Sequence, residues 1–347
     1  MLVAAVIDGD VYALNFDAGV GTWSRPTLIE NTAAPMLVVS GALDHQGNAI
    51  VVFSDFAIGG GGGWNRYIPG TGWGDSRTDA IAGQKRVALA NNGLAVLVHS
   101  VPGEIVNAYT LARGATQWSG PEGFVAAGSG WLTMPLGNSV LATYADNRSR
   151  TYLGKIYSPG TGWSAPEAIG TPGGDANSLS GDSRGDTALL TWTETSGVRA
   201  RLYDRGEWGP TVLLGSAWGG NSSATAGEHA LVTWAEAGPS QDSSEIRVRR
   251  YSKSSGWNEP TSLGLATQFG SNTVMMSGSG AALAAWTDGD AVTYRRQLPE
   301  ANWDVSRRIK GSGAGDVLDV WAADTLSGEA IMIWRVEDNG FWSARFE

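Results

Sequence analysis

A segment of seven residues with alternating side chains recurs along the chain and predicts a series of short β-strands. Its clearest copies span residues 188–194, 230–236 and 282–288, the first reading Ala-Leu-Leu-Thr-Trp-Thr-Glu. Weaker copies lie at 2–8, 49–55, 94–100, 140–146 and 330–336. Both faces of these segments carry apolar or Thr side chains, as expected for a strand with sheets packed on either side. No segment has the period of an amphipathic helix, so the pattern predicts an all-β chain.

Three further strands accompany each copy of this second strand. A turn of Gly, Asn or Asp precedes it, as in residues 44–48 and 182–186, and a shorter first strand precedes the turn. Third strands are predicted at 11–16, 106–111, 198–203, 246–251, 292–297 and 341–346. The four strands together predict a repeating antiparallel unit.

Seven Trp residues in similar surroundings mark the fourth strand of the unit. They are Trp23, Trp73, Trp118, Trp163, Trp208, Trp257 and Trp303. In four cases a Pro follows three residues later, at Pro26, Pro121, Pro166 and Pro260. Because Pro cannot donate a backbone hydrogen bond, it is tolerated at the edge of a sheet, and these segments are interpreted as the outermost strand of each unit.

Repeated four-stranded units predict a single β-propeller domain over residues 1–347, because each sheet needs neighbours to cover both of its faces. A stack of β-sandwiches would require longer domains and linkers. The expected units lie near 1–34, 35–83, 84–128, 129–173, 174–217, 218–268, 269–314 and 315–347. Counting hairpins favours eight blades, the first and last of them truncated. Seven remain the alternative, if residues 22–30 supply the outer strand of the C-terminal unit.

Composition narrows the classes of partner. The chain has 49 Gly and 16 Trp among 347 residues, no Cys, and a net charge of −10. This charge disfavours nucleic acid and anionic membranes as partners, and no apolar stretch is long enough to span a bilayer. Residues 1–8 do not resemble a signal peptide. We expect an extracellular, cell-surface or virion-associated protein.

The units resemble two kinds of known repeat. The pattern D-x-x-G-N-A…W…R-x-Y…G-W-x-x-P, seen around Asp44–Phe53 and Trp208, resembles propeller-like repeats of bacterial surface proteins. The order of strands is similar to that of the seven-bladed propeller lectins of insect-pathogenic bacteria, which bind fucosylated glycans between blades. No ligand-contacting motif of those lectins matches residue by residue, so none of their sites is transferred.

Residues present in every unit are attributed to the fold. Such a column is formed by Trp192, Trp234, Trp286 and Trp334, with Phe53, Tyr144 and Val6 as counterparts, and we expect it in the core between blades. An acid follows two residues later, at Asp8, Asp55, Asp146, Glu194, Glu236 and Asp288. Each carboxylate either caps its hairpin or pairs with a neighbouring Arg or Lys; the alternative is an acidic ring at one mouth of the propeller that attracts cations or a basic partner.

Residues that break the repeat are better candidates for a site. Trp131 and Trp218 lie in or beside connections between units, and Gly59–Gly63 with Trp64 is predicted to form an expanded loop. Strand direction places these features on the same face as the acids. The candidate ligand-binding residues are Trp131, Trp218, Trp64, Asp146, Glu194, Glu236 and Asp288. Exposed Trp beside carboxylates is typical of carbohydrate binding; the alternative is that these Trp only fill gaps.

The predicted function is a non-catalytic binding module that recognises surface glycans. A docking protein of a phage virion or another assembly is the alternative, and a sialidase-type glycoside hydrolase is the second alternative. Arg201, Arg249 and Arg295 fall in register in successive third strands, which suggests a feature of the blades rather than a catalytic arginine cluster. No metal or cofactor is expected, since the three His residues form no ligand-spaced pair.

Overall fold

The structure is a computed structural model of the chain. It describes residues 2–17, 19–32, 34–55, 61–81, 83–100, 106–124, 131–146, 151–170, 178–267, 270–299, 301–310, 315–324, 329–337 and 340–346. These residues form β-strands, turns and connections, and no helix occurs among them.

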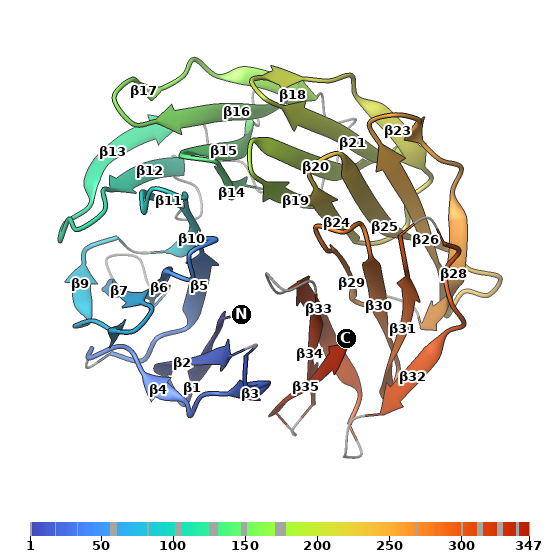
Figure 1. Ribbon diagram of the computed structural model, residues 1–347, viewed down its shortest axis with the longest axis horizontal. Helices are drawn as coiled ribbons and strands as arrows, with labels where there is room; N and C mark the ends of the chain where they lie inside the picture. Colours follow the sequence, from blue (N-terminus) through green and yellow to red (C-terminus); the bar gives the residue numbers. More distant parts are fainter. Residues whose placement is uncertain are drawn as a thin grey trace. The chain divides into compact units, whose positions relative to one another are not determined.

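Eight antiparallel sheets follow one another along the chain, and contacts divide them between two compact units, Met1–Thr171 and Pro172–Glu347. Figure 1 shows the strands of each sheet side by side in chain order. The first unit holds β1 (Leu2–Ile7), β2 (Asp10–Asp17), β3 (Thr22–Trp23) and β4 (Thr27–Leu28); β5 (Val38–Leu43), β6 (Ala49–Ser54), β7 (Gly62–Ile68), β8 (Gly72–Trp73) and β9 (Arg77–Asp79); β10 (Gln84–Leu89), β11 (Ala95–Ser100), β12 (Val106–Leu111) and β13 (Ser119–Phe124); and β14 (Trp131–Leu136), β15 (Ser139–Asp146), β16 (Thr151–Ser158), β17 (Gly162–Trp163) and β18 (Glu167–Gly170).

The second unit holds the other four sheets. They are β19 (Leu179–Arg184), β20 (Thr187–Glu194), β21 (Gly197–Asp204), β22 (Glu207–Trp208) and β23 (Val212–Gly215); β24 (Asn221–Ala226), β25 (His229–Ala237), β26 (Ser243–Ser252), β27 (Gly256–Trp257) and β28 (Thr261–Thr267); β29 (Asn272–Met276), β30 (Ala282–Asp288), β31 (Ala291–Gln297) and β32 (Arg307–Lys310); and β33 (Val317–Asp324), β34 (Ala330–Val336) and β35 (Gly340–Phe346).

The prediction of an eight-bladed β-propeller is confirmed. Each predicted unit contains one sheet, and each predicted second strand overlaps a strand of the structure. The seven-blade alternative is wrong because β3 and β4 pair with β2, through Phe16↔Trp23 and Tyr12↔Leu28, and not with the last sheet. As expected, blade 1 has no first strand and blade 8 no fourth strand among the described residues. A single domain over the whole chain stays a prediction.

The outer strand differs in one respect from the expectation: in five blades it is split into two short segments that both pair with the third strand. In blade 6, Trp257 pairs opposite Tyr251 with their ring centroids 5.5 Å apart, Pro260 interrupts the ladder, and pairing resumes at Thr261. The Pro therefore ends one segment rather than lying within a continuous strand.

The core consists of apolar layers between consecutive blades of each unit. The predicted aromatic column is confirmed as part of it: Trp192, Trp234, Trp286 and Trp334 are between 0% and 3% exposed. They lie at the ends of second strands that are buried on both faces, as in β25. In blade 3 the column continues with His99, which pairs opposite Lys85 of the first strand.

Candidate functional site

Trp218 lies on the surface of the second unit, in the connection between β23 of blade 5 and β24 of blade 6. Its side chain is 45% exposed. The backbone nitrogens of Trp218 and Gly219 both donate hydrogen bonds to the carbonyl of Ala235, at 2.9 and 3.3 Å. These bonds hold the connection against the end of β25, so the exposed Trp218 side chain is carried by a fixed segment.

Two Glu–Arg pairs lie at the ends of the hairpins on either side of this connection. In blade 5, the Nε of Arg199 donates to Glu194, and Arg199 Nη2 donates to the hydroxyl of Ser196 at 3.1 Å. In blade 6, Arg247 Nε donates to Glu236 Oε2 at 3.2 Å, and its Nη2 lies 3.0 Å from Glu245 Oε2. Each Arg side chain is 29% exposed, so both keep contact with solvent.

Gly215 brings the two hairpins and Trp218 to one place. A Cβ on Gly215 would lie 2.7 Å from the ring of Trp234 and 3.0 Å from Glu236 Oε1, and a Cβ on Gly197 would lie 2.0 Å from the carbonyl oxygen of Gly215. Only glycines permit this approach. The backbone at Gly215 therefore lies between the Glu194–Arg199 hairpin and the Glu236–Arg247 pair, three residues before Trp218.

We call Trp218, Glu194, Arg199, Glu236 and Arg247 the Trp218 surface. The sequence analysis named Trp218, Glu194 and Glu236 as candidates, and their role in ligand binding stays a prediction. Arg199 and Arg247 were missed. Pairing of the second and third strands could have identified them, because Arg199 lies directly opposite Trp192 and Arg247 directly opposite Trp234 of the core column.

Trp131 belongs to the first unit and differs from Trp218 in environment. It is the first residue of β14, pairs opposite Tyr144, and its half-buried side chain packs against the core cluster that contains Val98 and Phe124. Asp146 ends the neighbouring strand, and its charge together with burial raises the pKa of Tyr144. Burial is the larger of these two causes. Trp131 therefore contributes to the core between blades 3 and 4.

The expectation of a loop formed by the glycine run and Trp64 is wrong for Gly62, Gly63 and Trp64, while Gly61 lies before the strand. Gly59 and Gly60 lie outside the described residues, while Gly62, Gly63 and Trp64 belong to β7. Trp64 is only 4% exposed and contacts Trp118, with ring centroids 6.0 Å apart. Glycine at position 63 reflects close packing, because a Cβ there would lie 2.3 Å from the carbonyl oxygen of Arg77.

Four acids of the repeat column bond locally, as the simpler of the two interpretations expected. Glu194 and Glu236 pair with arginines of their own blades, and Asp288 lies 3.3 Å from Nη2 of Arg308. Asp55 accepts a hydrogen bond from the backbone nitrogen of Gly61 at 3.1 Å. A role in ligand binding for Asp146, Glu194, Glu236 and Asp288 stays a prediction.

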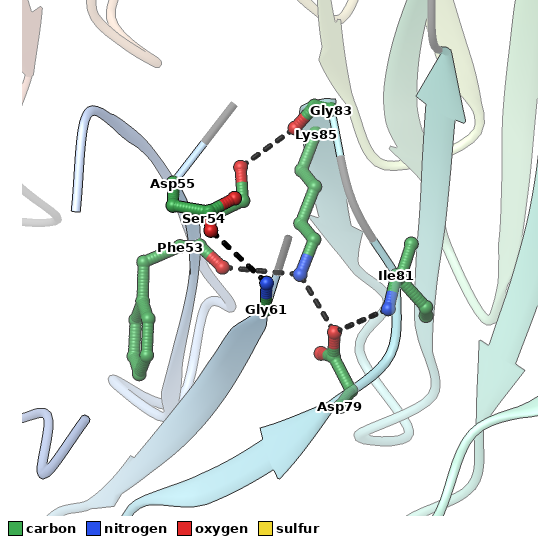
Figure 2. Close-up of polar contacts among 8 residues, drawn as sticks. All are labelled: Phe53, Ser54, Asp55, Gly61, Asp79, Ile81, Gly83 and Lys85. Atoms are coloured by element: carbon green, nitrogen blue, oxygen red, sulfur yellow. Dashed lines mark hydrogen bonds and ion pairs between the residues drawn. The ribbon is translucent and has the colours of Figure 1, made fainter. Parts of the chain in front are cut away.

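A buried polar cluster lies between blades 2 and 3 of the first unit (Figure 2). Lys85 Nζ, whose side chain is fully buried, donates to the carbonyl of Phe53 at 3.0 Å and to Asp79 Oδ1 at 2.8 Å. Asp79 Oδ1 also accepts from the backbone nitrogen of Ile81 at 2.9 Å. Burial lowers the pKa of Lys85, and the charge of Asp79 opposes this shift. With no exposed lysine surface, the cluster ties two blades together rather than presenting a ligand site.

The hydrogen bonds of Arg201 and Arg249 in the third strands support the interpretation that these arginines belong to the fold. Arg201 Nε donates to the carbonyl of Gly209 at 2.8 Å, and Arg249 Nε donates to that of Asn258 at 2.6 Å. Arg249 Nη1 also reaches Leu214 in the preceding blade. These guanidinium groups bind backbone carbonyls of outer strands within the second unit.

Within the described ranges, no group of three or more His, Asp or Glu side chains is arranged to hold a metal ion. The search for a helix long and apolar enough to cross a membrane finds none in the described part of the chain.

Comparisons with known proteins support the fold. No protein-family model matches the sequence, and no curated protein matches it. The structure is similar to the BP39L lectin from Burkholderia pseudomallei, with a TM-score of 0.58, 14% identity, and coverage of 89% of this chain and 98% of that chain. It is also similar to the β-propeller domain of the Trilobed protease from Pyrococcus furiosus, with a TM-score of 0.52, 8% identity, and coverage of 90% and 95%.

Both identities are low, so these likenesses establish the propeller fold and do not transfer an activity. The predicted similarity to β-propeller lectins is confirmed at the level of the fold. Resemblance to the lectins of insect-pathogenic bacteria in particular, and to bacterial surface repeats, stays a prediction.

Proposed function

We propose that this protein is a non-catalytic binding module that recognises glycans through the Trp218 surface. The observation that carries the proposal is the exposed side chain of Trp218, in a connection that begins at Gly215, beside the two hairpins that carry the Glu–Arg pairs. A fixed aromatic face beside several donors and acceptors is what a sugar ring requires, since its C–H face stacks on the ring while its hydroxyls bond to the flanking polar groups.

The charged pairs suit sugar hydroxyls in particular. Arg199 and Arg247 keep part of each guanidinium exposed, and an arginine has five N–H donors, of which the carboxylate partner uses only some. Glu236 is 19% exposed and can accept a hydrogen bond from a hydroxyl. Because the hydrogen bonds within each pair already hold its two side chains in place, little side-chain conformational entropy is lost when a ligand binds.

The same pairs argue against hydrolysis at this surface. Glycoside hydrolases use two carboxyl groups, one of which donates a proton to the leaving group. Here the carboxylates of Glu194 and Glu236 are both already engaged by hydrogen bonds from arginines of their own blades. The proposal is therefore binding without catalysis, as in adhesion to a glycan-bearing surface outside the cell.

A glycan array, followed by titration of the best ligand, tests the proposal. We expect the wild-type protein to bind a subset of glycans and Trp218→Ala to weaken that binding about 5- to 150-fold, corresponding to about 1–3 kcal/mol for a stacking aromatic side chain. The melting temperature should change little, because Trp218 is 45% exposed.

Trp321→Ala is the matched control, because Trp321 is also 45% exposed and belongs to blade 8 rather than to blades 5 and 6, which carry the two Glu–Arg pairs. Its glycan affinity should equal that of the wild type. The proposal fails if the wild-type protein binds no glycan, or if Trp218→Ala and Trp321→Ala behave alike.

A further inference from the structure

The ends of blades 5 and 6 that carry the Trp218 surface contain more acids than bases. The segments that form these ends span residues 192–199, 213–221 and 234–247. They hold four acids and two bases, which gives a net charge of −2: Glu194, Glu236, Asp242 and Glu245 against Arg199 and Arg247. A ligand held beside Trp218 therefore meets a local excess of negative charge.

Both arginines at these ends are bonded to carboxylates of their own blade. Arg199 Nε donates to Glu194. Arg247 lies between two carboxylates, with its Nε 3.2 Å from Glu236 Oε2 and its Nη2 3.0 Å from Glu245 Oε2. Because one guanidinium group in blade 6 serves two carboxylates, this blade keeps an excess negative charge at the surface. Neither arginine presents an uncompensated positive charge to an acidic ligand.

The two guanidinium groups nevertheless keep donors for a neutral ligand. Arg199 uses Nε for Glu194 and Nη2 for the hydroxyl of Ser196, and Arg247 uses Nε and Nη2 for its two carboxylates. Nη1 of each arginine donates no hydrogen bond to a group in the described part of the chain, and each side chain is 29% exposed. A sugar hydroxyl can accept a hydrogen bond from such a nitrogen and donate one to a neighbouring carboxylate. A sulfate or carboxylate group of a ligand can only accept.

Glu245 is the acid that distinguishes blade 6 from blade 5. It pairs directly opposite Glu236, whereas Gly197 takes the corresponding position in blade 5, opposite Glu194. Two like charges directly opposite each other in a sheet are unfavourable, and blade 5 forms the same hairpin without the second acid. The side chain of Glu245 is 27% exposed, so its charge reaches the surface. The fold therefore does not require this carboxylate.

Resting on the glycan-binding function proposed above, we propose that the Trp218 surface selects glycans without acidic groups and rejects their sulfated or sialylated counterparts. A neutral sugar stacks on Trp218 and exchanges hydrogen bonds with the flanking arginines and glutamates. A sulfate or carboxylate bound to either arginine lies beside that arginine's carboxylate partner, inside the screening length of about 8 Å at physiological ionic strength, and is repelled. Glu245 is a specificity-determining residue of this surface.

Pairs of glycans that differ only in one sulfate ester test this selectivity. The best-bound neutral glycan of the array and its sulfated counterpart are titrated against the full chain. We expect the neutral member to bind at least about fivefold more tightly, as the repulsion between two like charges about 4 Å apart in water predicts. In 1 M NaCl the ratio of the two affinities should fall toward one, because the screening length shortens to about 3 Å. Rejection by shape alone would not respond to salt.

Protein variants assign the selectivity to this surface. Glu245→Gln keeps an oxygen acceptor for Arg247 and removes one charge, so it should lower the neutral-to-sulfated affinity ratio about twofold or more. Adding Asp242→Asn should lower the ratio further. Glu207→Gln is the matched control, because Glu207 is an exposed acid of blade 5 that pairs opposite Asp204, at the other end of β21 from the Trp218 surface. Its ratio should equal that of the wild type.

The outcomes separate this inference from the function on which it rests. Equal or tighter binding of the sulfated glycan, a ratio that does not change with salt, or a ratio unchanged by Glu245→Gln would overturn the inference and leave glycan binding in place. If the wild-type protein binds no glycan on the array, the proposed function itself fails, and the inference fails with it.

Discussion

One residue of the first strand, opposite the core column, connects a blade to the preceding blade. In blades 6 and 7 this residue is an Asn, and in blade 3 it is a Lys. Asn221 and Asn272 pair opposite Trp234 and Trp286, and Lys85 pairs opposite His99. Asn272 Nδ2 donates to the carbonyl of Gly220 in the connection from blade 5, while its Oδ1 accepts from the hydroxyl of Thr233, both at 3.0 Å. Lys85 instead donates to a carbonyl and a carboxylate of blade 2.

This difference shows that a polar connection to the preceding blade can be made at this position by an amide or by an ammonium group, while blades 2, 5 and 8 have the apolar residues Val39, Leu179 and Val320 there. The connection through Asn272 carries no charge, because its amide bonds to a carbonyl and a hydroxyl. The lysine solution buries an ion pair, with side chains 0% and 8% exposed, and leaves Asp79 Oδ2 without a hydrogen-bond partner among the described groups. Burying charge carries a desolvation penalty, so the lysine connection depends strongly on both partners being present.

The largest effect is expected for Lys85→Ala. Removing one partner of a buried pair leaves Asp79 charged and uncompensated, and we expect a loss of about 3–5 kcal/mol in the free energy of unfolding, measured by chemical denaturation. Adding Asp79→Asn to Lys85→Ala should recover part of this loss, since the unpaired charge is removed. A loss below about 1 kcal/mol for Lys85→Ala would mean that water reaches Asp79 easily.

Asn272→Ala should cost less, because no charge is exposed to the core. The variant leaves the buried hydroxyl of Thr233 and the carbonyl of Gly220 without this partner, for an expected loss of about 1–3 kcal/mol. Asn302→Ala, at an exposed position before Trp303, is the control and should change the stability by less than about 0.5 kcal/mol. Equal losses in the two variants would contradict the proposed role of the amide.

Most of the fold could be predicted from the sequence because the same pattern of strands recurs in each unit. Period-two segments located the second strands, and the Trp residues located the outer ones. The split of the outer strand was not predicted. A Pro such as Pro260 is compatible both with an edge strand and with a break in the strand, so the sequence alone did not distinguish the two. The connections at Asn221 and Lys85 were also missed, because a tie between blades depends on spatial neighbours that no local pattern reveals.

Less of the candidate site could be predicted. Trp218 and Trp64 were both assigned to one surface, but Trp218 is exposed and Trp64 proved to be core. The two residues differ in what surrounds them: Trp64 continues a strand, whereas Trp218 lies in a connection held by backbone bonds to Ala235. An isolated aromatic residue in a sequence does not distinguish these cases, because Trp is stable both in cores and on binding surfaces.

The smallest effect concerns Asp182 in β19, another first strand of the second unit, which bonds to the next blade by accepting from the backbone nitrogen of Thr225 at 2.7 Å. Burial raises the pKa of Asp182 to about 6, although the bond from Thr225 and the charge of Arg184 oppose the shift. The residue retains some exposed surface, so the energetic consequence is smaller than the shift alone suggests.

The sign follows from proton binding. Between about pH 4 and pH 6 the folded protein keeps a proton on Asp182 that the unfolded chain releases, so this group's contribution to stability falls as the pH rises through that window. Asp182→Asn mimics the protonated form and keeps an acceptor for Thr225. We therefore expect the variant to be more stable than the wild type by about 1 kcal/mol at pH 7.5 and nearly equal to it at pH 4, measured by denaturant titration at both values. If the difference in the free energy of unfolding between the two proteins were the same at both pH values, the fold would not raise the pKa of Asp182. The first strand of blade 5 would then tolerate a charge, as the first strand of blade 3 does at Lys85.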